Sequence, residues 1–201
     1  MSSYRILCGI FIGAFSLGLT ITGCSSSTVF SPTDELAIPL PTGVLDDSNS
    51  AVGVTLIPAT QRVGAPPLSG TDLNGTDLVI NYSDARATVI NSWATWCAPC
   101  RVELPEFAQV ALDPRFADVN FIGLNVRDSQ DAARAFSADL PFASLMDPDG
   151  VLLAQIPDVP PQALPSTFIA DQQGRVAARI IGPVPSGDLE EIIQWVLDNE
   201  N

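Results

Sequence analysis

Two cysteines separated by two residues follow shortly after an apolar run, and this arrangement constrains the fold more than any other feature of the chain. The run 87–92 has the near-continuous apolar character of a buried strand. Cys97 and Cys100 then open a segment, 99–112, that has the character of a helix. The dipole and free N–H groups of a helix N-terminus stabilise a thiolate at the first cysteine, and the second sulfur lies one turn away. The sequence therefore predicts thiol–disulfide exchange where a strand meets a helix.

The composition excludes several other kinds of chemistry. The chain has 201 residues, a formal net charge of −14 and no histidine, and all nine of its basic residues are arginine. Without histidine, Ser-His-Asp and Cys-His catalysis, haem ligation and histidine-bound metal sites are excluded. A four-thiolate zinc site would need a second Cys-x-x-Cys, which the sequence lacks. We therefore expect no metal and no cofactor, and the acidity predicts that the chain does not bind nucleic acid.

The start of the chain has the features of a targeting segment. Arg5 supplies a positive charge, and the apolar stretch 6–19 is about the length of a signal peptide and short for a membrane span. The small residues that lead up to Cys24 resemble the lipobox of bacterial lipoproteins. That resemblance implies a lipoprotein signal peptide over 1–23 and a lipid on Cys24. The alternatives are an ordinary secretory signal peptide and an uncleaved anchor.

A segment without sustained periodicity follows the targeting segment. Residues 24–60 are rich in Ser, Thr, Pro, Gly and Asp, which is typical of a flexible tether. The tether would join the lipid anchor to a domain over 61–201. An alternative for the apolar patch 52–57 is a strand added to the edge of that domain.

The pattern of the remaining residues predicts an α/β domain. A hairpin is expected over 64–80, because the Asn74-Gly75 dipeptide favours a tight turn between strands. An order of strand, helix, strand and helix, followed by a hairpin and a helix, gives a mixed sheet covered on both faces. The expected strands are 87–92, 119–126, 166–170 and 176–181, and the expected helices are 99–112, 129–140 with Ser129 as its cap, and a last helix that includes 189–197 and is capped by Ser186 or Asp188.

Several short segments resemble those of one known group of proteins. The stretch 90–105, which holds both cysteines, is similar to the active-site segment of the TlpA/ResA/DsbE group of membrane-tethered, extracytoplasmic thioredoxins. The segments 64–67, 147–150 and 164–171 fall where that group has similar sequences. The resemblance covers 63–199. It implies a thioredoxin-like α/β fold, with a mixed central sheet flanked by helices and an N-terminal β-hairpin extension.

The same resemblance implies roles for the residues that carry the chemistry. Cys97 would be the exposed nucleophile that attacks a substrate disulfide, and Cys100, buried beneath it, would resolve the mixed disulfide. Pro165 would be the cis-proline that faces the cysteine pair. An inert structural disulfide is the alternative for the pair, but a bridge that closes so short a loop gains very little stability.

Three further residues are implied as contacts for the substrate. Trp96 would form an apolar surface beside Cys97, Leu164 would present its backbone to an extended substrate, and Thr167 lies in the same segment. The stretch 155–164, which borders the expected groove, departs from the group because it is rich in proline and lacks glycine.

Glu103 is a candidate for proton transfer, because it follows Cys100 by three residues and related proteins have a glutamate near the thiols. We hypothesise that it exchanges protons with the cysteines or raises their pKa values. A solvated acid in the first turn of a helix is the alternative. Asn91 is expected to be a hydrogen-bonded core amide, and since it cannot take a proton, any proton relay must use Glu103 or water.

Together these features predict a lipid-anchored thiol–disulfide oxidoreductase on the extracytoplasmic side of the cell membrane. It would reduce disulfides in exported proteins, with apocytochrome c as one candidate, and a membrane thiol donor would restore the dithiol. The first rival is an oxidant that forms disulfides in secreted proteins, because the same residues can run in that direction. A peroxidase is disfavoured because Ala94 stands where peroxiredoxins have threonine. A copper chaperone of the Sco type is disfavoured because that family uses Cys-x3-Cys and a histidine.

Overall fold

The computed structural model describes residues 53–200, which contain a six-stranded mixed sheet and a separate two-stranded hairpin. The predicted signal peptide, Cys24 and the tether up to residue 52 lie outside the described residues. The strands are β1 (Gly53–Leu56), β2 (Ser69–Thr71), β3 (Asp77–Val79), β4 (Ala87–Trp93), β5 (Val119–Val126), β6 (Ser144–Asp147), β7 (Ser166–Asp171) and β8 (Val176–Ile181). The helices are α1 (Ala98–Ala111), α2 (Gln130–Phe136) and α3 (Asp188–Asp198), with short 3-10 turns at Ala59–Gln61, Tyr82–Asp84, Pro114–Phe116 and Leu153–Gln155. This is the α/β architecture that the sequence predicts.

The strand order places the start of α1 between two loops. The sheet runs β1-β8-β7-β4-β5-β6, and β4 pairs parallel to β5 and antiparallel to β7. The register sets Trp93 opposite Asn125 and Ser92 opposite Ser166. The carboxyl end of β4 therefore lies beside the loop that follows β5 and beside the segment that leads into β7. Any group at the N-terminus of α1 can be contacted from both.

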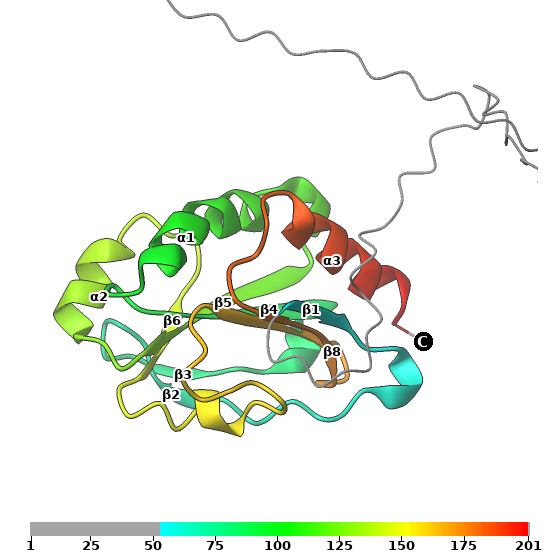
Figure 1. Ribbon diagram of the computed structural model, residues 1–201, viewed down its shortest axis with the longest axis horizontal. Coiled ribbons are helices and arrows are strands. Elements are labelled where there is room, and N and C mark those ends of the chain that lie inside the picture. Colours follow the sequence, from blue (N-terminus) through cyan, green and yellow to red (C-terminus); the bar gives the residue numbers. More distant parts are fainter. Residues whose placement is uncertain (1–52, 201) are drawn as a thin grey trace, which may run out of the picture. The chain divides into compact units, whose positions relative to one another are not determined.

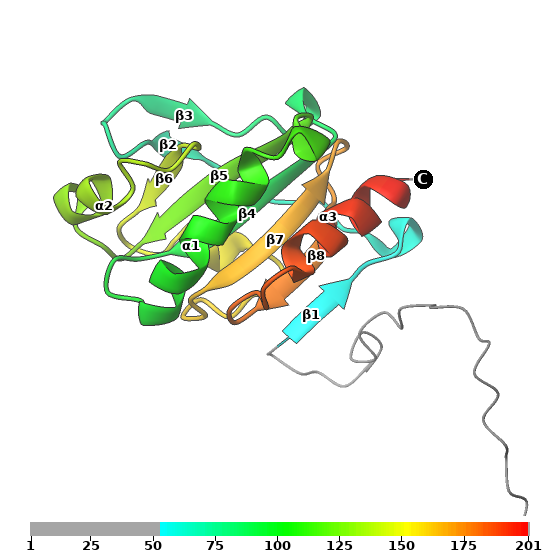
Figure 2. The ribbon, with the colours of Figure 1, turned by 90° about the horizontal axis from the view of Figure 1, so that it is seen from above.

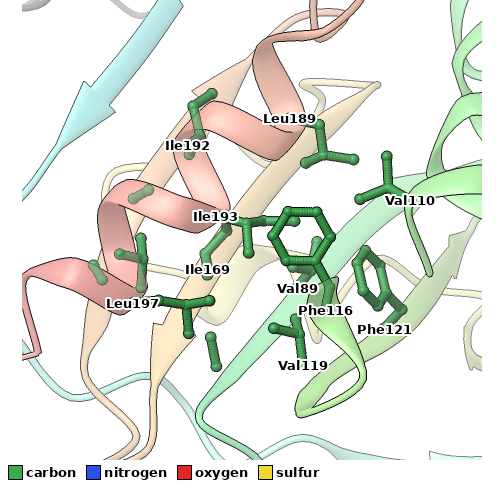
Figure 3. Close-up of a cluster of buried hydrophobic side chains, with 14 of the residues drawn as sticks. Val89, Val110, Phe116, Val119, Phe121, Ile169, Leu189, Ile192, Ile193 and Leu197 are labelled. Atoms are coloured by element: carbon green, nitrogen blue, oxygen red, sulfur yellow. The ribbon is translucent and has the colours of Figure 1, made fainter. Parts of the chain in front are cut away.

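Two apolar cores lie on the two faces of the sheet, as the two-residue period of a strand requires. Alternate residues of the central strands, such as Val89, Phe121 and Ile169, face a cluster that includes α1 and α3, shown in Figure 3. Their neighbours Ile90 and Phe168 belong to a second cluster on the opposite face. Figure 1 shows α1 and α3 on one face of the sheet and the β2–β3 hairpin on the other.

The segment before the predicted domain boundary is part of the fold. Gly53–Leu56 pairs antiparallel with β8, so the second interpretation of this segment, a strand at the edge of the domain, is confirmed (Figure 2). Arg62 is buried, and its Nη1 donates to Asp171 Oδ2 at 3.0 Å while its Nη2 donates to the Asn199 carbonyl at 2.8 Å. A buried cation with these partners fixes its own chain segment. The folded domain therefore extends at least to residue 53 rather than starting at 61.

The ends of two helices differ from those expected. α2 ends at Phe136, because the amide of Leu140 bonds the Ser137 carbonyl as a turn, and the side chain of Ser129 at its N-cap makes no capping bond. The N-cap of α3 is Gly187, not Ser186 or Asp188. Its backbone is left-handed, with φ 85°, and its amide donates to Glu106 Oε1 of α1 at 2.8 Å.

Gly123 of β5 lies close to Trp93, which belongs to the same apolar cluster as both cysteines. We expect Gly123→Ala to destabilise the protein by about 1–3 kcal/mol, the usual cost of overpacking. An added methyl would lie 2.7 Å from Trp93 Nε1 and would meet the hydroxyl of Ser144, which Trp93 Nε1 contacts at 3.2 Å. Denaturant unfolding would measure the change. Gly64→Ala is the matched control, because a methyl there meets nothing within 4 Å. Equal stability of both variants would contradict this account of the packing.

Candidate active site

The two cysteines lie where the sequence predicts, at the junction of β4 and α1, and they form a disulfide with a Cα–Cα distance of 5.3 Å. Cys97 is the N-cap of α1, and its Sγ accepts a hydrogen bond from the Cys100 amide at 3.3 Å. An N-cap position exposes a sulfur to the free N–H groups and the positive end of the helix dipole. When the disulfide is reduced, the same groups stabilise a thiolate on Cys97.

The sulfurs are less accessible than the sequence implied. Cys100 is fully buried, as expected, but Cys97 is only 5% exposed in this disulfide form, so its description as an exposed nucleophile needs correction. Cys97 belongs to an apolar cluster with Trp93, Leu104 and the half-buried Leu164, which explains the small exposure. The preceding Trp96 is 60% exposed, so its indole lies at the surface.

The segment before β7 contributes a cis peptide bond between Leu164 and Pro165, the geometry that the sequence predicts. Ser166, the next residue, pairs with Ser92 of β4, which brings this bond to the end of the strand that leads to Cys97. Leu164 packs against the cluster that contains both cysteines. The cis bond therefore lies next to a residue that packs on the same cluster as both cysteines.

Glu103 lies inside the protein, which excludes the solvated helix acid considered as its alternative. It is 4% exposed, one helical turn after Cys100 on the buried face of α1. Glu103 Oε1 accepts from Asn91 Nδ2 at 2.8 Å, and Oε2 accepts from the Val184 amide at 3.1 Å. Burial raises the pKa of Glu103 to about 7, and the charge of Glu106 adds to the rise, against the lowering effect of the two hydrogen bonds. A carboxyl group with this pKa can both give and take a proton near neutral pH.

Thr167 occupies a different place from the one expected of a substrate contact. Its side chain is 1% exposed, and its Oγ1 accepts from Asn91 Nδ2 at 3.1 Å. Asn91 is the buried, hydrogen-bonded amide that the sequence predicts, and it joins Thr167 to Glu103. Thr167 is therefore part of the internal network beneath the disulfide and not part of the exposed surface.

The sequence interpretation missed the loop that follows β5. Asp128 Oδ2 accepts from the Thr95 amide at 2.6 Å, and Oδ1 accepts from the Thr95 hydroxyl at 2.7 Å. Burial acts to raise the pKa of Asp128, but hydrogen bonds from Thr95, Asn125 and Ser129 outweigh it and hold the pKa below its ordinary value. The two hydrogen bonds from Thr95 to this carboxylate hold the loop before Cys97 in place. The sequence signal for this contact is the polar run that follows β5, the strand that pairs parallel with β4.

Within 53–200, no helix is long and apolar enough to cross a membrane. In the same range, no three acidic or cysteine side chains gather in a way that could hold a metal ion.

Known proteins are similar to this domain in sequence and in fold. The model of the AhpC/TSA family matches residues 63–179. The thiol:disulfide interchange protein HelX of Rhodobacter capsulatus is 34% identical over 117 residues, which are 57% of this chain and 61% of HelX. The thiol-disulfide oxidoreductase ResA of Bacillus thuringiensis is 28% identical over 134 residues, which are 66% of this chain and 76% of ResA.

A solved structure of a thiol-disulfide isomerase is also similar to this chain. The secreted thiol-disulfide isomerase from Corynebacterium glutamicum superposes with a TM-score of 0.66 at 29% identity, over 72% of this chain and 92% of that protein. The matched family region contains the cysteine pair at the start of α1 and the cis peptide bond before β7. The chain therefore belongs to the AhpC/TSA family, as a thioredoxin-like thiol–disulfide oxidoreductase.

Proposed function

We propose that this protein is a reductase of disulfides in exported proteins and that Cys97 and Cys100 are its catalytic residues. The observation that carries the proposal is the disulfide at the N-terminus of α1, with Cys97 as the N-cap and Cys100 buried behind it. A structural bridge gains stability by closing a long loop, and this one closes almost none. The helix N-terminus instead favours a reactive thiolate on the first cysteine.

In the proposed reaction the reduced protein gives two electrons to a substrate disulfide. The Cys97 thiolate attacks one sulfur of the substrate, a mixed disulfide forms, and the first substrate thiolate leaves and takes up a proton. Cys100 then loses its proton and attacks Cys97, which closes the Cys97–Cys100 disulfide and releases the second substrate thiol. A membrane-bound dithiol donor would return the pair to its reduced state.

Glu103 is proposed as the group that exchanges a proton with Cys100. Residues three apart on a helix lie on the same face, and both side chains are buried on the inner side of α1. A pKa of about 7 lets the Glu103 carboxylate accept the Cys100 proton when the mixed disulfide is resolved. The buried amide of Asn91 holds the carboxylate in place.

The substrate is proposed to lie between Trp96 and the cis Leu164–Pro165 bond. The exposed indole of Trp96 offers an apolar contact beside Cys97, and Leu164 packs against the apolar cluster that contains both cysteines. Because extended backbone pairs through its own N–H and C=O groups, a polypeptide can bind beside the cis bond without a specific side chain. The internal position of Thr167 leaves it a supporting role beneath this surface.

The proposed location is the extracytoplasmic side of the cell membrane, through a lipid on Cys24. The lipobox-like sequence before Cys24 supports the anchor, and the secreted enzyme to which the domain is similar supports an exported location. Apocytochrome c is a candidate substrate within this proposal. Removal of the signal peptide and a mass shift at Cys24 in membrane-derived protein would test the anchor.

The reduction potential of the Cys97–Cys100 pair tests the direction of electron flow. We expect a value near that of thioredoxin, about −270 mV, measured by equilibration of the protein with a glutathione or dithiothreitol buffer. A value near that of DsbA, about −120 mV, would overturn the reductase proposal and assign disulfide formation in secreted proteins. The Cys97→Ser variant is the control, because it cannot form the pair.

A further inference from the structure

Arg127 joins two segments that flank the cysteine pair. Its carbonyl accepts a hydrogen bond from Trp96 Nε1 at 3.0 Å, and its Nη1 donates to the carbonyl of Pro161 at 2.9 Å. Trp96 directly precedes Cys97, and Pro161 lies shortly before the cis bond at Pro165. One residue of the loop after β5 therefore fixes both the indole beside the nucleophile and the segment that leads to the cis proline.

The backbone and surroundings of Arg127 are shaped to hold this arrangement. Its φ is 50°, a left-handed conformation that residues other than glycine seldom adopt, and its amide donates to the Asp147 carbonyl at 3.0 Å. Gly150, with φ 72°, lies directly against the guanidinium, and a methyl group there would collide with it. Backbone in sparsely populated regions tends to occur where function requires it. Arg127 is exposed, but its guanidinium has defined contacts with the Pro161 carbonyl and with Gly150.

The segment that Arg127 holds leads directly into the cis Leu164–Pro165 bond. The stretch 155–164 is rich in proline and lacks glycine, and Pro161 and Gln162 within it are exposed. A polypeptide that extends from Cys97 past Leu164 must cross the surface between Trp96 and this stretch. We expect a small disulfide to react at Cys97 without contacting this stretch.

We infer that Arg127 is a positioning residue that makes this enzyme favour polypeptide disulfides over small disulfides. It acts through Trp96 and Pro161, by holding the two sides of the peptide-binding surface at a fixed separation. The inference rests on the proposed substrate surface, but it concerns the choice between substrates and not the direction of electron flow.

The test is Arg127→Gly, which keeps the backbone carbonyl, permits the left-handed conformation and removes the whole side chain with its guanidinium. We expect the KM for insulin, as the polypeptide probe, to rise about tenfold, the size expected for losing one hydrogen bond to a charged group. With bis(hydroxyethyl) disulfide as the small probe, kcat/KM should change by no more than about twofold. Arg134→Ala on α2 is the control, since its guanidinium pairs only with the neighbouring Asp131 among the described residues.

Two other outcomes would overturn the inference. One is an equal loss on both probes, which would mean that the variant damages the cysteine pair itself, and the other is no change on either probe. Arg127→Lys keeps a cation at this position and tests the same ratio if the glycine variant unfolds. The ratio of activities on the polypeptide probe and on the small probe can be measured in both directions of exchange, with the disulfides or with the corresponding thiols. An oxidising potential would therefore reject the reductase proposal and leave this test intact.

Discussion

Replacing Cys100 with serine is expected to stop turnover and to leave the protein covalently attached to its substrate. Cys97 can still attack a disulfide, but the sulfur that should displace the substrate from the mixed disulfide is missing. Turnover should fall by more than about 10³-fold, as it does when one member of a catalytic group is removed. Non-reducing electrophoresis of the reduced variant mixed with insulin would show the adduct, and mass spectrometry would place it on Cys97.

The Cys97→Ser variant tests which of the two cysteines attacks the substrate. Cys97→Ser should form no adduct and have no activity, because the buried Cys100 cannot reach an external disulfide. Cys100→Ala serves as a second trap in case a buried hydroxyl disturbs the cluster around it. Adducts on Cys100 in the Cys97→Ser protein would reverse the two roles and reject the proposed order of attack.

Elements with strong local signals could be predicted from the sequence almost residue by residue. The strands 119–126 and 176–181 agree with β5 and β8 at both ends, because each is an apolar run bounded by turn residues. The turn after β7 agrees as well, where the Gly174 amide bonds the Asp171 carbonyl at 2.8 Å. In these places local preference and tertiary structure favour the same conformation.

Elements that depend on distant partners could not be predicted in this way. β6 is a strand of four residues that was not expected, and it is defined by its parallel pairing with β5. The cap of α3 is decided by Glu106, which belongs to α1 and bonds the Gly187 amide. In both cases the deciding contact lies far away in sequence, where neither pattern nor propensity carries a signal.

In the candidate site, too, the features set by local sequence could be predicted and those set by distant contacts could not. The cysteine pair, the cis proline and the core position of Asn91 follow from local sequence and resemblance, and the structure has each of them. The contribution of the loop after β5 does not, because Arg127 and Asp128 contact the segment before Cys97 from a part of the chain that is distant in sequence. The low exposure of Cys97 was also missed, since it depends on an apolar cluster whose members come from distant parts of the chain.

The buried Glu103 predicts an unusual dependence of stability on pH in the oxidised protein. Its pKa rises from an ordinary 4.5 to about 7 on folding, chiefly through burial. Between these values the folded protein binds more protons than the unfolded chain, so the free energy of unfolding decreases as pH rises and levels off above about pH 7. The total decrease should be about 3 kcal/mol, at about 1.4 kcal/mol for each unit of pKa.

Glu103→Gln should remove this decrease. Denaturant unfolding of both oxidised proteins at about pH 5 and pH 8 would show a loss of stability in the wild type that is about 2.5 kcal/mol larger than in the variant. Glu191→Gln, on the exposed side of α3, removes the same charge and should behave like the wild type. A variant with the full wild-type pH dependence would show that Glu103 is not the group that titrates.

The activity of the same variant separates a structural carboxyl group from a proton-transfer group. If Glu103 accepts the proton of Cys100, the wild-type rate should rise as pH increases through about 7, because only the carboxylate is a base. In Glu103→Gln this rise should disappear and the rate above pH 7 should fall about 100-fold, the usual contribution of a positioned acid or base. Loss of the stability change without loss of the rise in rate would make Glu103 a buried charge with no part in the reaction. Loss of both the stability change and the rise in rate would show that Glu103, held by Asn91, takes part in the reaction of the cysteine pair.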